Sequence, residues 1–237
     1  GTGSLGTALA RRLLAEGHKV RAIARGEAAH ERLIQAVGEQ PNLSTLVADV
    51  RDLERMRLAL KDATDVIHAA AMKSIALADY NPAEATRTNV QGTENVARAA
   101  LDCGVERAIL VSTDKARAPS TLYGSTKLAA ERLWLGSNAY AGAKHKPFAC
   151  VVYGNVFGSR VSVLHAFREQ APSDTLKITH HASTRFHIRM SQAVDFVLDA
   201  LASAKPGDVW IPKLPTYRVI DMAEAVAPGA KWDYIGL

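Results

Sequence analysis

Short apolar runs alternate with amphipathic stretches along the first two thirds of this 237-residue chain. Five runs have the character of strands, at residues 19–24, 45–47, 65–69, 107–112 and 148–153. Helical spacing of apolar residues fills the segments 3–16, 82–101 and 123–136, the first closed by Gly17 and the second opened by Pro82. Strands that alternate with helices predict an α/β fold, in which helices cover both faces of a parallel sheet.

A glycine-rich segment opens the first of these helices. Glycine lets the backbone approach a pyrophosphate closely, and a helix N-terminus offers free N–H groups and the positive end of a dipole. We therefore expect a Rossmann-type doubly wound parallel sheet whose first loop binds a dinucleotide. The strand that should precede the loop is not in the sequence, so we expect this first strand to be missing from the chain. The loop residues expected to bind the cofactor are Gly1, Gly3, Ser4, Leu5 and Gly6.

The ends of the next strands indicate which dinucleotide is bound. Arg25 follows the strand 19–24, and no acidic residue stands beside it. An acid there would bind a ribose 2′-hydroxyl, whereas an arginine suits a 2′-phosphate, so NADP is favoured and NAD remains possible. The alternative for Arg25 is a solvated surface arginine. Further cofactor contacts are expected from Asp49 and Val50 at the adenine, and from the small residues Ala69, Ala70 and Ala71 after the strand 65–69.

A tyrosine and a lysine four residues apart, Tyr123 and Lys127, stand on one face of a predicted helix. An ammonium group beside a phenol is expected to lower its pKa, so that the phenolate takes a proton from a sugar hydroxyl while a nicotinamide takes the hydride. Asp114 and Lys115 follow the strand 107–112 and add a second acid and base. A redox pair beside a spare acid/base pair suggests oxidation followed by elimination. The alternatives are a helix-surface pair for Tyr123 and Lys127 and a loop salt bridge for Asp114 and Lys115.

These motifs together resemble the extended short-chain dehydrogenase/reductases, and more specifically the inverting UDP-N-acetylglucosamine 4,6-dehydratases. The most specific part is Ser112-Thr113-Asp114-Lys115-Ala116 followed by Tyr123-Gly124-Ser125-Thr126-Lys127. The similarity extends over nearly the whole chain through the segments 68–73, 81–82, 88–93, 153–156, 158–160, 184–186 and 212–213. The sequence departs from the family pattern at Ser74, Val152, Val161 and His187, in segments expected to face the substrate.

The resemblance implies a role for each reactive residue. Tyr123, assisted by Lys127, would remove the C4 hydroxyl proton, and Thr113 would hydrogen-bond the C4 oxygen. Lys115 would then take the C5 proton, and Asp114 would protonate the departing C6 hydroxyl. Residues that resemble the UDP-sugar contacts of the family are Lys73, Asn89, Asn155, Arg160, Arg185 and Lys213, with Lys73 also near the cofactor. Asn89 is open to a second interpretation, as an anchor between its helix and the active-site strand.

Beyond residue 154 the alternation loosens. A helix at 191–204, capped by Ser191, and short strands at 208–211 and 233–235 are expected there. We therefore predict a cofactor-binding and catalytic domain over residues 1–154 and a smaller, interleaved substrate-binding region over 155–237.

Bulk properties restrict the classes of partner. The net charge is +5 and the pI is near 9.3, but the basic residues are scattered, which favours an anionic small substrate over nucleic acid. No apolar run reaches membrane-spanning length, no signal peptide is visible, and the histidines lack metal-ligand spacing. Cytoplasmic location and a homo-oligomer are expected by analogy with the family.

Three functions remain open at this stage. The first is the inverting 4,6-dehydratase of a UDP-N-acetylhexosamine, for surface glycan biosynthesis. The second is a UDP-sugar C4-epimerase or a dehydratase that retains the C5 configuration. The third is an NADP-binding regulator without turnover, against which the intact Tyr-Lys and Asp-Lys pairs argue.

Overall fold

The computed structural model describes residues 2–142, 147–157 and 163–236. The chain divides into two compact units, and each is described by itself. The first comprises Gly1–Tyr153 with Val194–Ile211, and the second Gly154–Ala193 with Pro212–Leu237. The segment 194–211, which the sequence grouped with the C-terminal region, thus belongs to the first unit.

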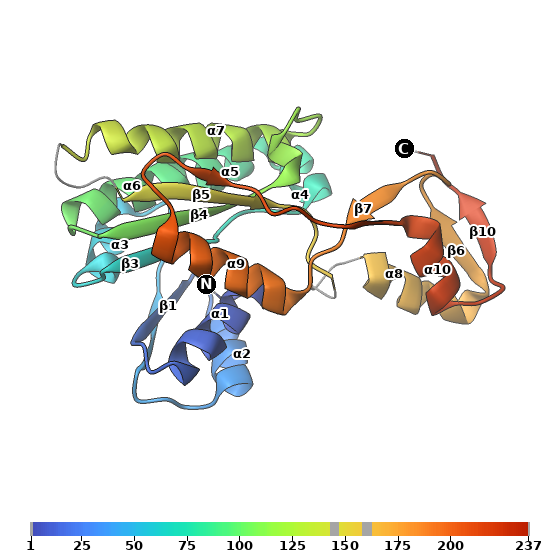
Figure 1. The fold of residues 1–237 in the computed structure, drawn as a ribbon, viewed down its shortest axis with the longest axis horizontal. Helices are drawn as coiled ribbons and strands as arrows, with labels where there is room; N and C mark the ends of the chain where they lie inside the picture. Colours follow the sequence, from blue (N-terminus) through green and yellow to red (C-terminus); the bar gives the residue numbers. More distant parts are fainter. Residues whose placement is uncertain (1, 143–146, 158–162, 237) are drawn as a thin grey trace. The chain divides into compact units, whose positions relative to one another are not determined.

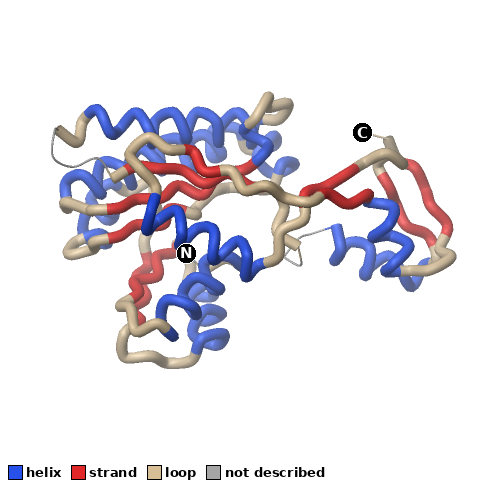
Figure 2. The backbone as a smooth tube through the Cα atoms, viewed as in Figure 1, coloured by secondary structure: helices blue, strands red, loops and turns tan. Residues whose placement is uncertain are grey.

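The first unit alternates strands and helices, as Figures 1 and 2 show. Its order is α1 (Ser4–Ala15), β1 (Val20–Ala24), α2 (Glu27–Val37), β2 (Leu43–Val47), α3 (Leu53–Leu60), β3 (Asp65–His68), α4 (Ile75–Tyr80), α5 (Pro82–Thr86), the π-helical η1 (Arg87–Gln91), α6 (Gly92–Asp102), β4 (Arg107–Thr113), the 3₁₀ turn η2 (Asp114–Ala116), α7 (Leu122–Gly136), η3 (Ser137–Ala139) and β5 (Phe148–Tyr153). The chain re-enters this unit within α9 (Met190–Ser203) and adds β8 (Val209–Trp210).

The strands of this unit are parallel and form two sheets, β1-β2 and β3-β4-β5-β8. In register, His68 lies opposite Leu110, and Thr113 lies opposite Tyr153. The C-terminal ends of β3, β4 and β5 therefore meet at one edge, which is where ligands bind in such sheets. Within the described residues no strand pairs with both β1 and β3, so the two sheets are separate.

The core of the first unit lies between this sheet and helices α6 and α7, which lie along one side of β4 and β5 in Figure 1. Trp134 of α7 is fully buried, meets Phe148 edge-on with ring centroids 4.8 Å apart, and donates from Nε1 to the carbonyl oxygen of Ala149 at 2.9 Å. Burying a side chain of this size stabilises the fold by roughly 3 kcal/mol. This packing fixes α7 against the strands whose ends form the site.

Most predicted elements of this unit are present. The segment 82–101 begins at Pro82 as expected, but it is interrupted by the π-helical η1 between α5 and α6. Gly17 follows α1 with a φ of 84°, the left-handed conformation that glycine favours after a helix. The predicted cap at Ser191 is wrong: α9 begins at Met190, and the side-chain Oε1 of Gln192 accepts from the Arg189 backbone N–H at 3.0 Å.

The second unit is smaller and contains α8 (Val163–Gln170), the 3₁₀ turn η4 (Ala171–Ser173), β6 (Thr175–Ile178), β7 (Thr184–Phe186), β9 (Thr216–Arg218), α10 (Val219–Val226) and β10 (Lys231–Tyr234). Strand β6 pairs with β10 in parallel, and β7 pairs with β9 antiparallel. Phe167, Leu176 and Met222 form its core. Of these elements the sequence predicted only β10, because the strands are short and their alternation is weak.

Candidate active site

The end of β4 carries the reactive segment. Thr113 ends the strand, and its Oγ1 accepts from the Lys115 backbone N–H at 3.4 Å, which turns the chain into η2. The Arg117 N–H closes that turn by donating to the carbonyl oxygen of Asp114 at 2.9 Å. Strand and turn therefore present Thr113, Asp114 and Lys115 together at the sheet edge.

Helix α7 packs directly on this turn, and Gly124 makes the approach possible. A Cβ built at Gly124 would lie 2.3 Å from the carbonyl oxygen of Lys115 and 3.0 Å from the Cβ of Pro119. The helix itself begins at its cap Thr121, whose Oγ1 accepts from the Gly124 N–H at 3.2 Å. Two elements that are separate in sequence thus meet at backbone distance beside Tyr123.

Tyr123 is buried and hydrogen-bonded to the Thr113 side chain. Burial raises the pKa of the Tyr123 phenol, the Thr113 hydrogen bond partly opposes that rise, and the Asp114 carboxylate adds to it. The structure therefore places Tyr123, Thr113 and Asp114 within interaction range of one another.

Lys127 lies one turn further along α7, and its side chain is almost fully buried. Its Nζ donates to the carbonyl oxygen of Val111 at 2.9 Å, and burial lowers the pKa of this ammonium to about 8. The expectation that Lys127 lowers the pKa of Tyr123 is not met here, because desolvation dominates at both groups. The ammonium is held by the strand and not by the phenol.

Asp114 and Lys115 form a close pair, with Nζ of Lys115 3.2 Å from Oδ1 of Asp114. Both side chains are about one third exposed. The Asp114 Oδ1 also accepts from the Thr113 hydroxyl at 3.0 Å. An acid and a base therefore lie side by side, accessible from solvent and linked through Thr113 to Tyr123.

Asn89 is an anchor in this structure. It is buried in the π-helical η1, its Oδ1 accepts from the Met72 N–H at 2.7 Å, and its Nδ2 donates to the Met72 carbonyl and to Oγ1 of Thr126. Both amide hydrogens are used, so no donor is left for a substrate. Of the two roles that the sequence left open for Asn89, the geometry supports an anchor, but Asn89 joins η1 to the loop after β3 and to α7 and not to the strand β4.

His68 at the end of β3 is part of the same core. Its Nε2 lies 3.0 Å from Oγ1 of Thr93, and its ring stacks on Trp134 with centroids 5.6 Å apart. Because the Thr93 hydroxyl donates to the Asn89 carbonyl at 2.7 Å, Nε2 of His68 is the donor in its bond. Burial, together with the nearby Lys127 ammonium, lowers the pKa of His68 to about 3, so this imidazole is neutral.

The remaining cofactor candidates lie at the start of α1 and after β3. Helix α1 begins after Gly3 without a side-chain cap, and no atom lies within 4 Å of a Cβ built there. Ser4, Leu5 and Gly6 form the first turn, and Ala69, Ala70 and Ala71 are exposed or half-buried after β3, where Lys73 is exposed. Gly1 lies outside the described residues.

Asp49 follows β2 and is flanked by two arginines. Arg51 donates to its carboxylate at 2.7 and 3.0 Å, and Nη1 of Arg25 lies 4.0 Å away. Hydrogen bonds and charge from Arg51, with the charge of Arg25, hold the pKa of Asp49 below its usual value although burial acts in the opposite direction. Arg25 is largely exposed, and Val50, which follows Asp49, is buried.

The proposed substrate residues Asn155, Arg185 and Lys213 belong to the second unit. Asn155 and Arg185 line one small cavity of about 40 Å³ there, with Phe157, Tyr217 and Met222. The Arg185 charge partly offsets the rise that burial gives the pKa of Tyr217. Lys213 is not among the residues that line this cavity, and Arg160 lies outside the described residues.

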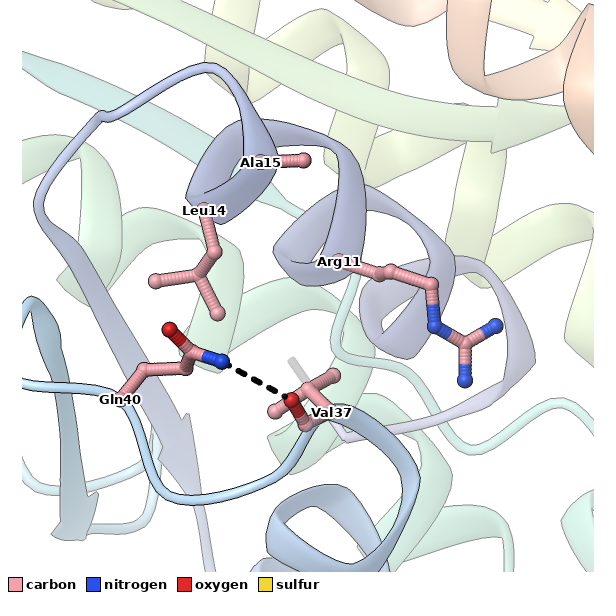
Figure 3. Close-up of a pocket in the computed structure, with 5 residues that line it drawn as sticks. All are labelled: Arg11, Leu14, Ala15, Val37 and Gln40. Atoms are coloured by element: carbon pink, nitrogen blue, oxygen red, sulfur yellow. Dashed lines mark hydrogen bonds between the residues drawn. The ribbon is translucent and has the colours of Figure 1, made fainter.

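A larger cavity, of about 180 Å³, lies between α1 and α2 of the first unit (Figure 3). Its lining residues are Arg11, Leu14, Ala15, Val37 and Gln40, and the side chain of Gln40 donates to the Val37 carbonyl at 3.4 Å. The Arg11 guanidinium points away from the other labelled side chains and donates to the Ala36 carbonyl. No residue assigned to chemistry borders this cavity.

Three residues of the site region were not singled out from the sequence. Arg117 and Glu131 form an ion pair beside Ser112, and Tyr153 ends β5 next to Tyr123. Burial raises the pKa of Tyr153, and within the described residues its hydroxyl has no hydrogen-bond partner. The sequence could have indicated Glu131, because Tyr123, Lys127 and Glu131 follow one another at intervals of four residues and therefore share one face of a helix.

Across the described residues, no three His, Cys, Asp or Glu side chains come together as a metal-ligand set. In that same part of the chain, no helix has both the length and the apolar character needed to cross a membrane.

A parallel sheet with a phosphate loop and a buried Tyr-Lys pair defines a Rossmann-type protein of the short-chain dehydrogenase/reductase kind. The sequence profile of the family described as "Polysaccharide biosynthesis protein" matches residues 1–233. The chain belongs to that family.

Two curated relatives cover nearly all of the chain. The UDP-N-acetylglucosamine 4,6-dehydratase (inverting) of Campylobacter jejuni is 39% identical over 241 residues, which cover 100% of this chain and 72% of the relative. The UDP-glucose 4-epimerase of Rickettsia rickettsii is 34% identical and covers 95% of this chain and 68% of its own length.

Solved structures agree with the fold. The X-ray structure of Pen from Bacillus thuringiensis has a TM-score of 0.94 at 32% identity, covering 100% of this chain and 76% of that one. MoeE5 in complex with UDP-glucose and NAD has a TM-score of 0.79 at 19% identity, covering 98% of this chain and 83% of that one. At that identity the second comparison supports the fold alone.

Proposed function

We propose that this chain is an NADP-dependent UDP-N-acetylglucosamine 4,6-dehydratase that inverts C5. The observation that carries the proposal is the acid/base pair Asp114–Lys115 beside Tyr123, linked through Thr113. A C4-epimerase needs only the oxidation at C4, whereas loss of water across C5 and C6 needs a second base and a second acid. The 39% identity to an inverting dehydratase supports the same assignment.

The first step uses α7 and the end of β4. Tyr123 accepts the C4 hydroxyl proton, and Thr113 is placed to hydrogen-bond the C4 oxygen. A bound nicotinamide would supply hydride-transfer chemistry at C4 and C6. Its positive charge in the oxidised form would favour the Tyr123 phenolate, which burial disfavours in the chain alone.

The second step uses the turn η2. It uses Lys115 as the neutral amine base and Asp114 as the carboxylic acid, whose side chains lie 3.2 Å apart. Lys115 then takes the C5 proton, which the C4 ketone has made acidic, and Asp114 protonates the C6 hydroxyl as it leaves as water. Reprotonation of C5 from the opposite face inverts that centre.

The exposed cation Arg25 supports NADP over NAD. We expect Arg25→Ala to weaken NADP binding about tenfold to a hundredfold and to leave NAD binding nearly unchanged, because only NADP carries the 2′-phosphate. Fluorescence titration of the purified chain with each dinucleotide measures this. Equal losses for both would contradict the assignment. Arg11→Ala is the control, because Arg11 borders the α1–α2 cavity and is not among the expected cofactor contacts.

One experiment tests the activity. Purified protein with NADP is incubated with UDP-N-acetylglucosamine in heavy water, and the product is examined by mass spectrometry and NMR. Loss of one water with deuterium at an inverted C5 supports the proposal, and Lys115→Ala should abolish both. Deuterium at C5 with its configuration kept indicates a retaining dehydratase.

An isomer of unchanged mass indicates the epimerase, the second candidate, which the 34% identical relative favours. No product from several UDP-sugars, with NADP still bound, indicates a regulator. A cytoplasmic location is part of the proposal, because it is where we expect the nucleotide sugar to be made.

A further inference from the structure

A buried carboxylate lies behind the turn that carries the acid/base pair. Glu131 of α7 is 2% exposed. The Ser112 hydroxyl donates to its Oε1, and the Arg117 guanidinium donates to its Oε2. A buried carboxylate is costly unless it is paired and hydrogen-bonded, and here each oxygen has its own donor.

Its two donors flank the reactive pair in sequence. Ser112 stands two residues before Asp114, in β4, and Arg117 stands two residues after Lys115. The backbone N–H of Arg117 also closes η2 on the Asp114 carbonyl at 2.9 Å. Glu131 therefore holds the chain on both sides of Asp114 and Lys115.

The same helix carries the redox pair. Tyr123, Lys127 and Glu131 are spaced by four residues, so they share one face of α7, the face toward β4. Lys127 bonds the Val111 carbonyl, and Glu131 bonds the next residue, Ser112. The carboxylate thus couples the helix of the first chemical step to the turn of the second.

We propose that Glu131, acting through Ser112 and Arg117, is a positioning residue that fixes the Asp114–Lys115 pair relative to Tyr123. This inference rests on the proposed function. Loosening the turn should therefore affect two rates differently. Removal of the C5 proton and loss of water become slower, whereas oxidation at C4, which uses Tyr123 and Lys127, is little changed. Misplacement of a reacting group by about 1 Å can cost about a hundredfold in rate.

The test compares Arg117→Gln, Glu131→Gln and the double variant. In single turnovers with NADP and UDP-N-acetylglucosamine, each single variant should eliminate water about 10- to 100-fold more slowly. Near-ultraviolet absorbance of the reduced nicotinamide should then accumulate, since C4 is still oxidised. The double variant should be no slower than the slower single variant, because both changes break one interaction.

A general loss of structure slows oxidation and elimination together, or the rate losses of the two single variants multiply in the double variant. Either result overturns the proposal. Arg117→Lys should restore part of the elimination rate. Since the Arg117 side chain is 43% exposed, its variants test the proposal even where Glu131→Gln does not fold.

A matched control exists at the other end of the same strand. Arg107 of β4 bonds both oxygens of Asp65 of β3, at 2.5 and 3.0 Å, remote in sequence from the turn. Arg107→Gln removes a comparable ion pair and should leave both rates unchanged.

A readout without substrate separates this inference from the proposed function. Hydrogen–deuterium exchange of the amides between Lys115 and Ala118 should quicken in Arg117→Gln and Glu131→Gln but not in Arg107→Gln. If the wild-type protein has no dehydratase activity but exchange is still faster in these two variants, the proposed function fails and the positioning role of Glu131 stands. If exchange is unchanged in both variants, the positioning role is overturned.

Discussion

Gly124 shows how a single residue can determine the geometry of the site. It lies beside Tyr123 in α7, where the helix touches the backbone of Lys115. A glycine within a helix usually costs about 1 kcal/mol relative to alanine. At this position the contact with η2 outweighs that cost, because a side chain would have to displace the turn.

We therefore expect Gly124→Ala to lower the free energy of unfolding by about 1–3 kcal/mol, since overpacking exceeds the helical gain. Water elimination should fall about a hundredfold, because the turn that carries Asp114 and Lys115 must move. Thermal unfolding and the heavy-water assay measure the two effects.

Gly136 is the matched control in the same helix, because no atom lies within 4 Å of a Cβ built there. Gly136→Ala should stabilise the protein by about 0.5–1 kcal/mol with unchanged turnover. If Gly124→Ala behaved in the same way, close packing at η2 would not matter for the reaction.

At the scale of elements, α7 combines a buried phenol with a buried ammonium, and the abundance of their charged forms responds to pH in opposite directions. The Tyr123 phenolate increases with pH, and its pKa is raised. The Lys127 ammonium, with a pKa of about 8, is lost as the pH rises above that value. The active form needs the phenolate and the ammonium together.

The rate of C4 oxidation should therefore rise about tenfold per pH unit below pH 8 and level off above it, because loss of the Lys127 proton then offsets the gain in phenolate. In Lys127→Met the rate should be about a hundredfold lower, and its rise should continue past pH 8. Single-turnover absorbance at several pH values measures both profiles. A wild-type profile with no change of slope near pH 8 would contradict this role.

The π-helical η1 is the second element that the tertiary structure determines. Residues with hydrogen-bonding side chains are common in helices. Nothing in the sequence of 82–101 shows whether Asn89 is a surface residue, a ligand contact or an anchor within the protein. Only packing against Thr126 and Met72 shows why the helix is wound differently there. Such π-helical segments are frequent near functional sites.

At the scale of the whole molecule, the neutral His68 links stability to pH. Its folded pKa, about 3, lies below the usual value of 6.5, so the unfolded chain binds the proton more readily between these values. The stabilising contribution is complete above pH 6.5 and is lost as the pH falls toward 3.

Each pH unit below 6.5 should thus remove up to about 1.4 kcal/mol of unfolding free energy through this one group. Denaturant unfolding between pH 4 and 7 measures the slope, and His68→Gln should reduce it by up to one proton. An identical slope in this variant would show that His68 is not the group responsible.

The sequence determined the order of strands β1 to β5, the helices α1 and α7, the helical segment 82–101, the position of the Tyr-Lys pair and the family, but it did not predict α2, α3 or α4. These follow from local properties: strand and helix periodicity, glycine at the phosphate loop, and a tyrosine and a lysine one helical turn apart. The weakly patterned second unit was largely missed for the same reason, because its short strands carry little periodic signal.

Only the tertiary structure decided what surrounds each group. Burial raised the pKa of Tyr123, which Lys127 was expected to lower, and placed Asn89 in the core. Folding also brought Arg117 and Ser112 onto Glu131. Desolvation and partner choice depend on contacts between residues far apart in sequence, and spacing along one chain does not contain them.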